Sequence, residues 1–380
     1  MNAAEIDKAN YISARDNSHQ DLLVYSAKKS GRSPLQIQRE FSRIANSHSR
    51  LNMVEYVRTG LYDVDRHTSE ERDRFISNDL HWQIAHSCND KGWISAAEDK
   101  VLAAILLNAG AVPVPETVGV LDKSSRTYPG LKKIASADAL AELLKTYSGE
   151  TLFCKVVTGM VSFGAFRIDS GDATQITCSG HPPMSHEQFL AEFVGQNAYV
   201  VQRELKNHSR LSGYASALAT VRMVNMINDR GLLCPFAVIK LPQGGNIADA
   251  FWRPGNLACD VDVGSGRIRT VARRGIEMEY LDDHPEHAGL MGLELPFWSQ
   301  LREINERAAQ IFAPIRYQST DIAITQDGPV VVELNYGGGF DLPQYASGRG
   351  MLTPAVRAFF ESCGVVFGPK KKRGLLWGSR

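Results

Sequence analysis

The sequence predicts an α+β fold that begins with a helical region. Residues 1 to 91 carry helix signals and contain no glycine-rich nucleotide loop. Further along, β-branched and apolar runs bounded by turn residues recur, above all in the stretch from Asp321 to Asn335. With 380 residues, of which 43% are apolar, the chain is long enough for two or three domains with sizeable cores.

Charge and cysteine usage exclude several classes of protein. Lys plus Arg equals Asp plus Glu at 42 each, so no overall field favours nucleic acid or an anionic membrane. No apolar run approaches the roughly 20 residues that cross a bilayer, and the polar N-terminus is not a signal peptide. The six cysteines have no paired spacing, which fits reduced thiols. We expect a cytoplasmic protein without a nucleic-acid partner or stable membrane insertion; the oligomeric state stays open.

Capping residues predict where several helices begin. Ser33 before Pro34 is a cap followed by a favoured first-turn proline, and Thr68 to Glu71 forms a capping box. A second box, Ser95 to Glu98, predicts a helix that runs to Gly110. The N-terminal helices are expected to pack on the rest of the chain.

A lysine interrupts the strand predicted for residues 151–157. Lys155 has apolar neighbours, an awkward setting unless its ammonium group reaches an anion. The loop from Thr158 to Gly164 has spaced glycines and can present backbone N–H groups to phosphates as a lid. An ordinary strand and loop is the alternative.

Two later stretches also carry polar groups among apolar residues. Residues 198–205 predict a strand that ends in polar side chains, for which an amphipathic edge strand is the alternative. Arg222 lies between β-branched and apolar residues and needs a fixed anionic partner. That partner is either a transferring phosphoryl group or the carboxylate of a structural salt bridge.

A β-hairpin is predicted around the turn at residues 326–329. Glu333 and Asn335 lie two apart on its second strand, so they share a face. A three-residue loop with Gly328 in the left-handed conformation pairs Asp321 with Glu333, whereas a two-residue turn pairs it with Leu334. Two carboxylates and an amide oxygen suit Mg²⁺ held jointly with nucleotide phosphates. Polar strand ends that face water are the alternative.

A glycine run, Tyr336-Gly-Gly-Gly-Phe-Asp341, follows these candidate ligands and favours a close backbone approach. The pattern Asp-Ile-Ala-Ile-Thr-x-Asp-Gly-Pro followed by Glu-x-Asn resembles the ATP-grasp superfamily. In particular it is similar to the branch called sugar-transfer-associated ATP-grasp proteins. The resemblance covers about residues 92 to 352.

This resemblance implies an ATP-grasp fold in which two subdomains clamp ATP. The subdomains are expected at 92–205 and 206–368, after a helical region at 1–91 and before a basic tail at 369–380. The implied site residues are Lys100, Lys155, Ser162 and Gly164 at the phosphates, Gln202, Arg203, Glu204 and Leu205 at the adenine, Ser209 near the ribose, Lys155 and Arg222 as catalytic cations, and Asp321, Glu333 and Asn335 as metal ligands. For Lys100 the alternative is a solvated helix lysine.

The implied activity is ATP- and Mg²⁺-dependent ligation of two small molecules, a carboxylate and an amine, through an acyl phosphate. The branch name suggests an amino acid joined to a sugar acid or amino sugar. Two features depart from the family pattern. No Rossmann-like domain precedes the nucleotide domain, and Ser319 stands where many ligases have an arginine two residues before the metal Asp. Arg316, Arg222 and Arg349 are candidate substitutes, and a phosphotransferase is the alternative activity.

Overall fold

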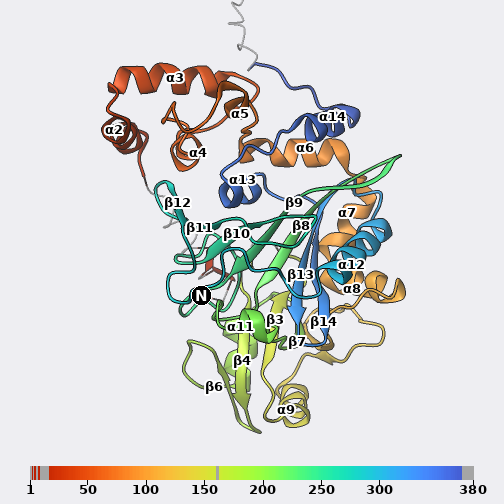
Figure 1. Cartoon of the computed structure of the whole chain (residues 1–380). Helices are drawn as coiled ribbons and strands as arrows, with labels where there is room; N and C mark the ends of the chain where they lie inside the picture. The colour runs from red at the N-terminus through yellow and green to blue at the C-terminus, as the bar shows by residue number, and fades with distance from the viewer. Residues whose placement is uncertain (1, 3, 6, 9–16, 160–161, 370–380) are drawn as a thin grey trace, which may run out of the picture.

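The computed structural model describes residues 2, 4–5, 7–8, 17–159 and 162–369, so most of the predicted basic tail lies outside it. Two seven-stranded sheets form the framework, each built from its own stretch of chain. Figure 1 shows the N-terminal helices at one end of the molecule and the first sheet at the other, with the second sheet between them. None of the helices in the described ranges is long and apolar enough to cross a membrane.

The first sheet has the strand order β2-β1-β7-β3-β4-β5-β6. Strand β7 pairs antiparallel with both β1 and β3, and only β1 and β2 are parallel. Helix α9 packs Leu140, Leu143 and Leu144 into the core on one face. The elements are β1 (Thr117–Leu121), β2 (Lys133–Ile134), α9 (Ala137–Thr146), β3 (Leu152–Val156), β4 (Phe166–Gly171), β5 (Gln175–Cys178), β6 (Met184–Ser185), α10 (His186–Gln188), η2 (Phe189–Val194) and β7 (Tyr199–Arg203).

The second sheet is antiparallel throughout, in the order β12-β11-β10-β9-β8-β13-β14. Helices α7, α8 and α12 lie beside its β13 and β14 end (Figure 1). The elements are α7 (Lys91–Glu98), α8 (Lys100–Ala109), α11 (Ser209–Ser212), β8 (Thr220–Asn228), β9 (Gly231–Leu241), β10 (Leu257–Val261), β11 (Val271–Arg274), β12 (Met278–Leu281), α12 (Trp298–Ile311), β13 (Tyr317–Thr325), β14 (Gly328–Asn335), α13 (Asp341–Ser347) and α14 (Pro354–Ser362).

The hairpin of β13 and β14 has one of the two pairings considered, Asp321 with Glu333. The three-residue loop expected to give this pairing is not formed, because Thr325 pairs with Gly328 and the turn consists of residues 326–327. That turn alone would set Asp321 opposite Val332. A bulge between Asp321 and Ile322 shifts the register by one residue and brings Glu333 opposite Asp321.

Helix starts follow the predicted caps in two cases out of three. The capping boxes at Ser33 and Thr68 are both formed. The box at Ser95 was wrong, because α7 begins after Asp90 and α8 after Asp99, and each aspartate accepts two backbone N–H groups. The N-terminal helices are α2 (His19–Ser30), α3 (Pro34–Asn46), α4 (Met53–Arg58), α5 (Ser69–Asp73), η1 (Asn78–Leu80) and α6 (His81–Cys88).

Close contacts fasten this helical region to α13 and to the loop that follows it. The Gln344 side chain bonds both the N–H and the carbonyl of Ile76, at 2.9 and 2.8 Å. A Cβ atom on Gly350 would meet backbone atoms of Arg74 and Phe75 at 2.3 and 2.4 Å. Only glycine therefore fits where these two segments cross.

Gly350→Ala is expected to lower the free energy of unfolding by about 2 to 3 kcal/mol, because backbone atoms cannot turn aside as a flexible side chain can. Urea unfolding measures the change. Gly213→Ala is the control, since its Cβ would have no neighbour within 4 Å. Equal unfolding midpoints for the two variants would contradict this packing.

Candidate active site

A cavity of about 940 Å³ is lined by residues of both sheets and of the N-terminal helical region. It brings together most of the residues singled out in the sequence, whereas Gly164 and Ser209 do not line it. The predicted residues that line it are Lys100, Lys155, Ser162, Gln202, Arg203, Glu204, Leu205, Arg222, Asp321, Glu333 and Asn335.

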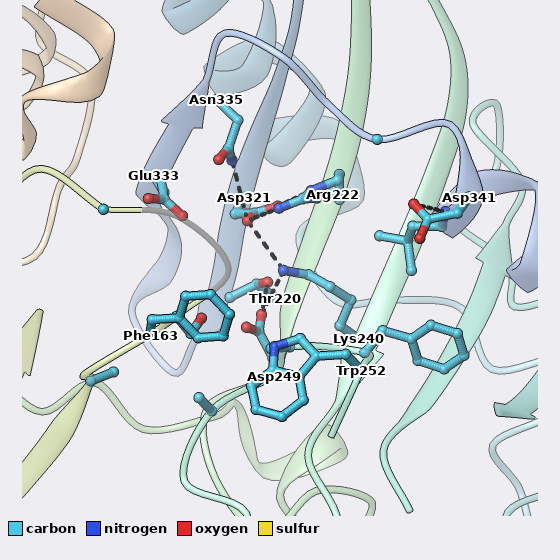
Figure 2. Close-up of a pocket in the computed structure, with 18 of the residues that line it drawn as sticks. Phe163, Thr220, Arg222, Lys240, Asp249, Trp252, Asp321, Glu333, Asn335 and Asp341 are labelled. Carbon is cyan, nitrogen blue, oxygen red and sulfur yellow. Dashed lines mark hydrogen bonds and ion pairs between the residues drawn. The ribbon is translucent and has the colours of Figure 1, made fainter. Parts of the chain in front are cut away.

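Asp321 is the centre of a buried charge network. It lies on β13 directly across from Arg222 on β8, whose Nε and Nη2 donate to its two carboxylate oxygens at 2.8 and 2.7 Å. Lys240 on β9 donates to one of the same oxygens at 3.1 Å (Figure 2). Burial alone would raise the pKa of Asp321, but Arg222 and Lys240 hold it well below its usual range. Asp321 is therefore ionised at neutral pH.

Glu333 faces a second pair of cations. Lys100 Nζ lies 3.1 Å from Glu333 Oε1 and also donates to the Gly159 carbonyl at 2.9 Å. Burial opposes ionisation of Glu333, yet Lys100 and Lys155 lower its pKa. Burial lowers the pKa of Lys155, and attraction to Glu333 opposes this shift. Both predicted phosphate lysines thus favour the ionised form of one carboxylate, and Lys100 also contacts it.

The donor set fits Mg²⁺ shared with a ligand better than a metal held by protein alone. Asn335 Nδ2 lies 3.5 Å from Asp321 Oδ2, so the amide shares the face of the two carboxylates. Within the residues that the structure covers, no group of three or more His, Cys, Asp or Glu is placed to hold a metal ion. Two carboxylates and one amide leave coordination positions for phosphate oxygens and water, the usual arrangement for Mg²⁺.

The sequence prediction missed the role of Lys240, Asp249 and Thr220 in this network. Lys240 Nζ lies 2.9 Å from Asp249 Oδ2, and Thr220 Oγ1 donates to the same carboxylate. The signal was present, since Lys240 interrupts an apolar strand as Lys155 does. The network joins cations Lys100, Lys155, Arg222 and Lys240 to anions Asp249, Asp321 and Glu333. Four cations against three anions leave a charge of +1, which favours an anionic ligand.

Loop residues close one side of the cavity. Phe163 meets Trp252 edge to face with ring centroids 5.8 Å apart, and Figure 2 shows both rings near the charged network. Gly164 is buried, and its N–H donates to Asp7 at 2.9 Å instead of facing the cavity. This is a correction to its predicted phosphate contact. Residues 160–161 of the predicted lid lie outside the described chain.

The segment after β7 presents free backbone groups. Within the described residues, neither the Leu205 N–H nor the Glu204 carbonyl has a hydrogen-bond partner, while both residues line the cavity. These two groups belong to one trans peptide and point in opposite directions, so a ligand in the cavity can bond only one of them. Arg203 is exposed, and its guanidinium forms ion pairs with Glu116 and Glu150. Gln202 is buried and its amide donates to Thr117 Oγ1 at 3.3 Å.

Ser209 lies away from the cavity, which corrects its predicted ribose contact. It begins α11, is exposed, and its N–H donates to Gln326 Oε1 at 3.3 Å. Ser209 is the first residue of this short helix and is not among the residues that line the cavity.

Ser319 is buried, and its hydroxyl has no hydrogen-bond partner within the described residues. Among the candidate replacements for the family arginine, Arg316 bonds the Ile227 carbonyl and Arg349 bonds Asp260, and neither lines the cavity. Arg222 does line it.

A family model described as sugar-transfer associated ATP-grasp matches residues 81–358. No curated protein matches the chain.

Three solved structures align with part of the chain at low sequence identity. N5-carboxyaminoimidazole synthase of Aspergillus clavatus aligns with a TM-score of 0.38 at 11% identity, over 75% of this chain and 58% of that one. The VanG D-Ala:D-Ser ligase of Enterococcus faecalis gives 0.40 at 11%, over 71% and 64%. The D-alanine-D-alanine ligase of Coxiella burnetii gives 0.37 at 13%, over 70% and 57%. The chain thus spans about three fifths of the length of these proteins.

Proposed function

The chain belongs to the family of sugar-transfer associated ATP-grasp proteins, and we propose that it is an ATP- and Mg²⁺-dependent carboxylate–amine ligase of the cytoplasm. It would join an amino acid to a sugar acid or an amino sugar through an acyl phosphate. The observation that carries this proposal is the shared cavity, which is lined both by the network around Asp321 and Glu333 and by the predicted adenine segment at residues 202–205.

The two lysines near Glu333 are assigned to the nucleotide. Lys155 lies on β3 and Lys100 in the first turn of α8; Lys100 contacts Glu333, and both lysines lower the pKa of that carboxylate. A triphosphate bound beside the two lysines would balance part of their positive charge, which Glu333 balances in its absence. The lysines would hold the phosphates in line for transfer, which is the main catalytic contribution in phosphoryl transfer.

Asp321, Glu333 and Asn335 are assigned to Mg²⁺, which when bound would neutralise charge on the β- and γ-phosphates. Arg222 and Lys240 have a separate task. They fix the Asp321 carboxylate in one orientation and keep it ionised. Arg222 also lines the cavity, and we assign it to the charge that develops on the transferring phosphoryl group.

A phosphotransferase is the second candidate, and Ser319 favours it. A ligase must stabilise the tetrahedral intermediate that forms when an amine attacks the acyl phosphate, and a neutral hydroxyl buried in β13 cannot do this as an arginine does. Arg222 is the remaining guanidinium of the three candidates, and we assign it that stabilising role.

ADP formation is expected to require one carboxylate and one amine together, tested against a panel of uronic acids, amino sugars and amino acids. Phosphate release should match the amide formed, and the product mass should correspond to condensation with loss of water. Hydroxylamine should intercept the acyl phosphate as a hydroxamate. A phosphorylated product formed from a single acceptor, with no amine present, would overturn the ligase in favour of the phosphotransferase.

A further inference from the structure

The cavity continues past the charged network to the N-terminal helical region. Residues of α4 and α13 form this end, among them Arg58 and Tyr345. Figure 2 places Asp341, the first residue of α13, on the other side of Arg222 and Lys240 from Glu333. A nucleotide that spans the Leu205 segment and Glu333 therefore leaves this end of the cavity for another molecule.

Arg58 carries a buried guanidinium, with an exposed fraction of 9% for the residue. Within the described residues, its Nε has no hydrogen-bond partner and the guanidinium forms no ion pair, although Arg58 lines the cavity. Its nearest recorded contact is the Tyr345 ring, whose centroid lies 5.7 Å from the guanidinium carbon. A cation–π contact offsets only part of the cost of burying this charge.

The carboxylate one turn earlier on the same helix does not neutralise Arg58. Glu55 is committed to backbone groups, accepting from Asn52 N–H at 3.0 Å and Asn78 N–H at 2.7 Å in its capping box. Burial raises the pKa of Glu55 to about 7, so it carries only part of a negative charge near neutral pH. Arg274 lines the same end of the cavity and adds a second guanidinium.

Arginine stays protonated in proteins, and a buried charged side chain normally has an oppositely charged or hydrogen-bonding partner. The missing partner of Arg58 is then an oxyanion that enters through the cavity. A carboxylate or phosphate matches the planar fork of a guanidinium.

We propose that Arg58 binds an oxyanion, either a carboxylate or a phosphate, on the acceptor substrate. This inference rests on the proposed function, because it assigns the nucleotide to the Glu333 end and the acceptor to the Arg58 end. It also gives the N-terminal helical region a task. In this chain, α4 supplies the substrate wall that a Rossmann-like domain would otherwise provide.

The test is calorimetric titration of the full-length protein, saturated with Mg²⁺ and a non-hydrolysable ATP analogue, with D-glucuronate, glucose-6-phosphate and neutral glucose. Arg58→Met should weaken binding of the preferred anion by about 10- to 100-fold, the usual contribution of a charge-assisted hydrogen bond, and leave affinity for the analogue unchanged. Arg58→Lys should keep part of the affinity. Arg39→Met is the matched control, because Arg39 is exposed on α3 and does not line this cavity.

Tighter binding of glucuronate identifies the ligand group as a carboxylate, and tighter binding of glucose-6-phosphate identifies it as a phosphate. Either result supports the proposal if Arg58→Met removes the preference for that anion over neutral glucose. The proposal fails if neither anion binds the wild type at millimolar concentration, if glucose binds as well, or if Arg58→Met binds like the wild type. If Arg58→Met has a lowered melting temperature, the affinity of Arg58→Lys for the anion is compared with that of the wild type instead. If the analogue itself does not bind, the proposed function fails, and the same titrations without nucleotide still test Arg58.

Discussion

Glu333→Ala is expected to reduce ADP formation by about a thousandfold or more, because it removes a carboxylate assigned to Mg²⁺ at the point where phosphoryl charge develops. The loss of stability should be small. Glu333 keeps 27% of its side chain exposed, and Lys100 retains its bond to the Gly159 carbonyl. The measurement is ADP release with the substrate pair that supports the wild type, alongside a thermal melt of each protein.

Two further variants make the Glu333 result specific. Glu333→Gln keeps the size of the side chain and removes its charge, so it should lose nearly as much activity as the alanine variant. Glu294→Ala is the matched control, since Glu294 is exposed and pairs with Arg267 outside the cavity. Full ADP formation by a folded Glu333→Ala protein would remove the central claim about this site.

The hairpin of β13 and β14 shows which features strand alternation predicts and which it does not. Alternation placed Glu333 and Asn335 on one face from the sequence alone, and the structure agrees with the pairing of Asp321 and Glu333. The route to that pairing was not predictable, because a bulge takes up the extra residue at Val332. Bulges depend on how both strands pack, and strand alternation does not encode them.

Local competition explains the incorrect cap at Ser95. The Ser-x-x-Glu pattern is present, but Asp90 and Asp99 offer carboxylates to the same stretch of backbone and begin the two helices instead. A single-segment pattern cannot rank such competing caps. The predicted cap at Ser33 and the predicted capping box at Thr68 have no competitor of this kind, and both are confirmed.

Contacts between segments that are far apart in the chain could not be predicted from the sequence. Asp7 meets Gly164 across 157 positions, and Asp321 receives Lys240 across 81. Neither pair has a spacing that marks it. A lysine in an apolar strand signals that a partner exists, as for Lys155 and Lys240, but only the sheet order β9-β8-β13 determines which carboxylate it meets.

Arg222→Met is expected to lower the free energy of unfolding by about 3 to 5 kcal/mol, because it leaves Asp321 buried with Lys240 as its one remaining cation in the network. Asp321→Asn should also destabilise the protein, since it strips Arg222 of its bidentate partner. Both single variants are also expected to lose ADP formation by two or more orders of magnitude, about the cost of removing one charge-stabilising group from such a site.

The double variant Arg222→Met with Asp321→Asn separates a structural salt bridge from a catalytic pair. Removing both partners leaves no unpaired charge of that pair, so unfolding stability should recover by more than additivity of the single variants allows. ADP formation should not recover, because the proposed site has then lost both a metal ligand and a cation that faces the phosphates. Urea unfolding and ADP release on all four proteins complete the cycle. If activity returned together with stability, the pair would serve only the fold, and the chemistry would have to depend on Glu333 and the lysines.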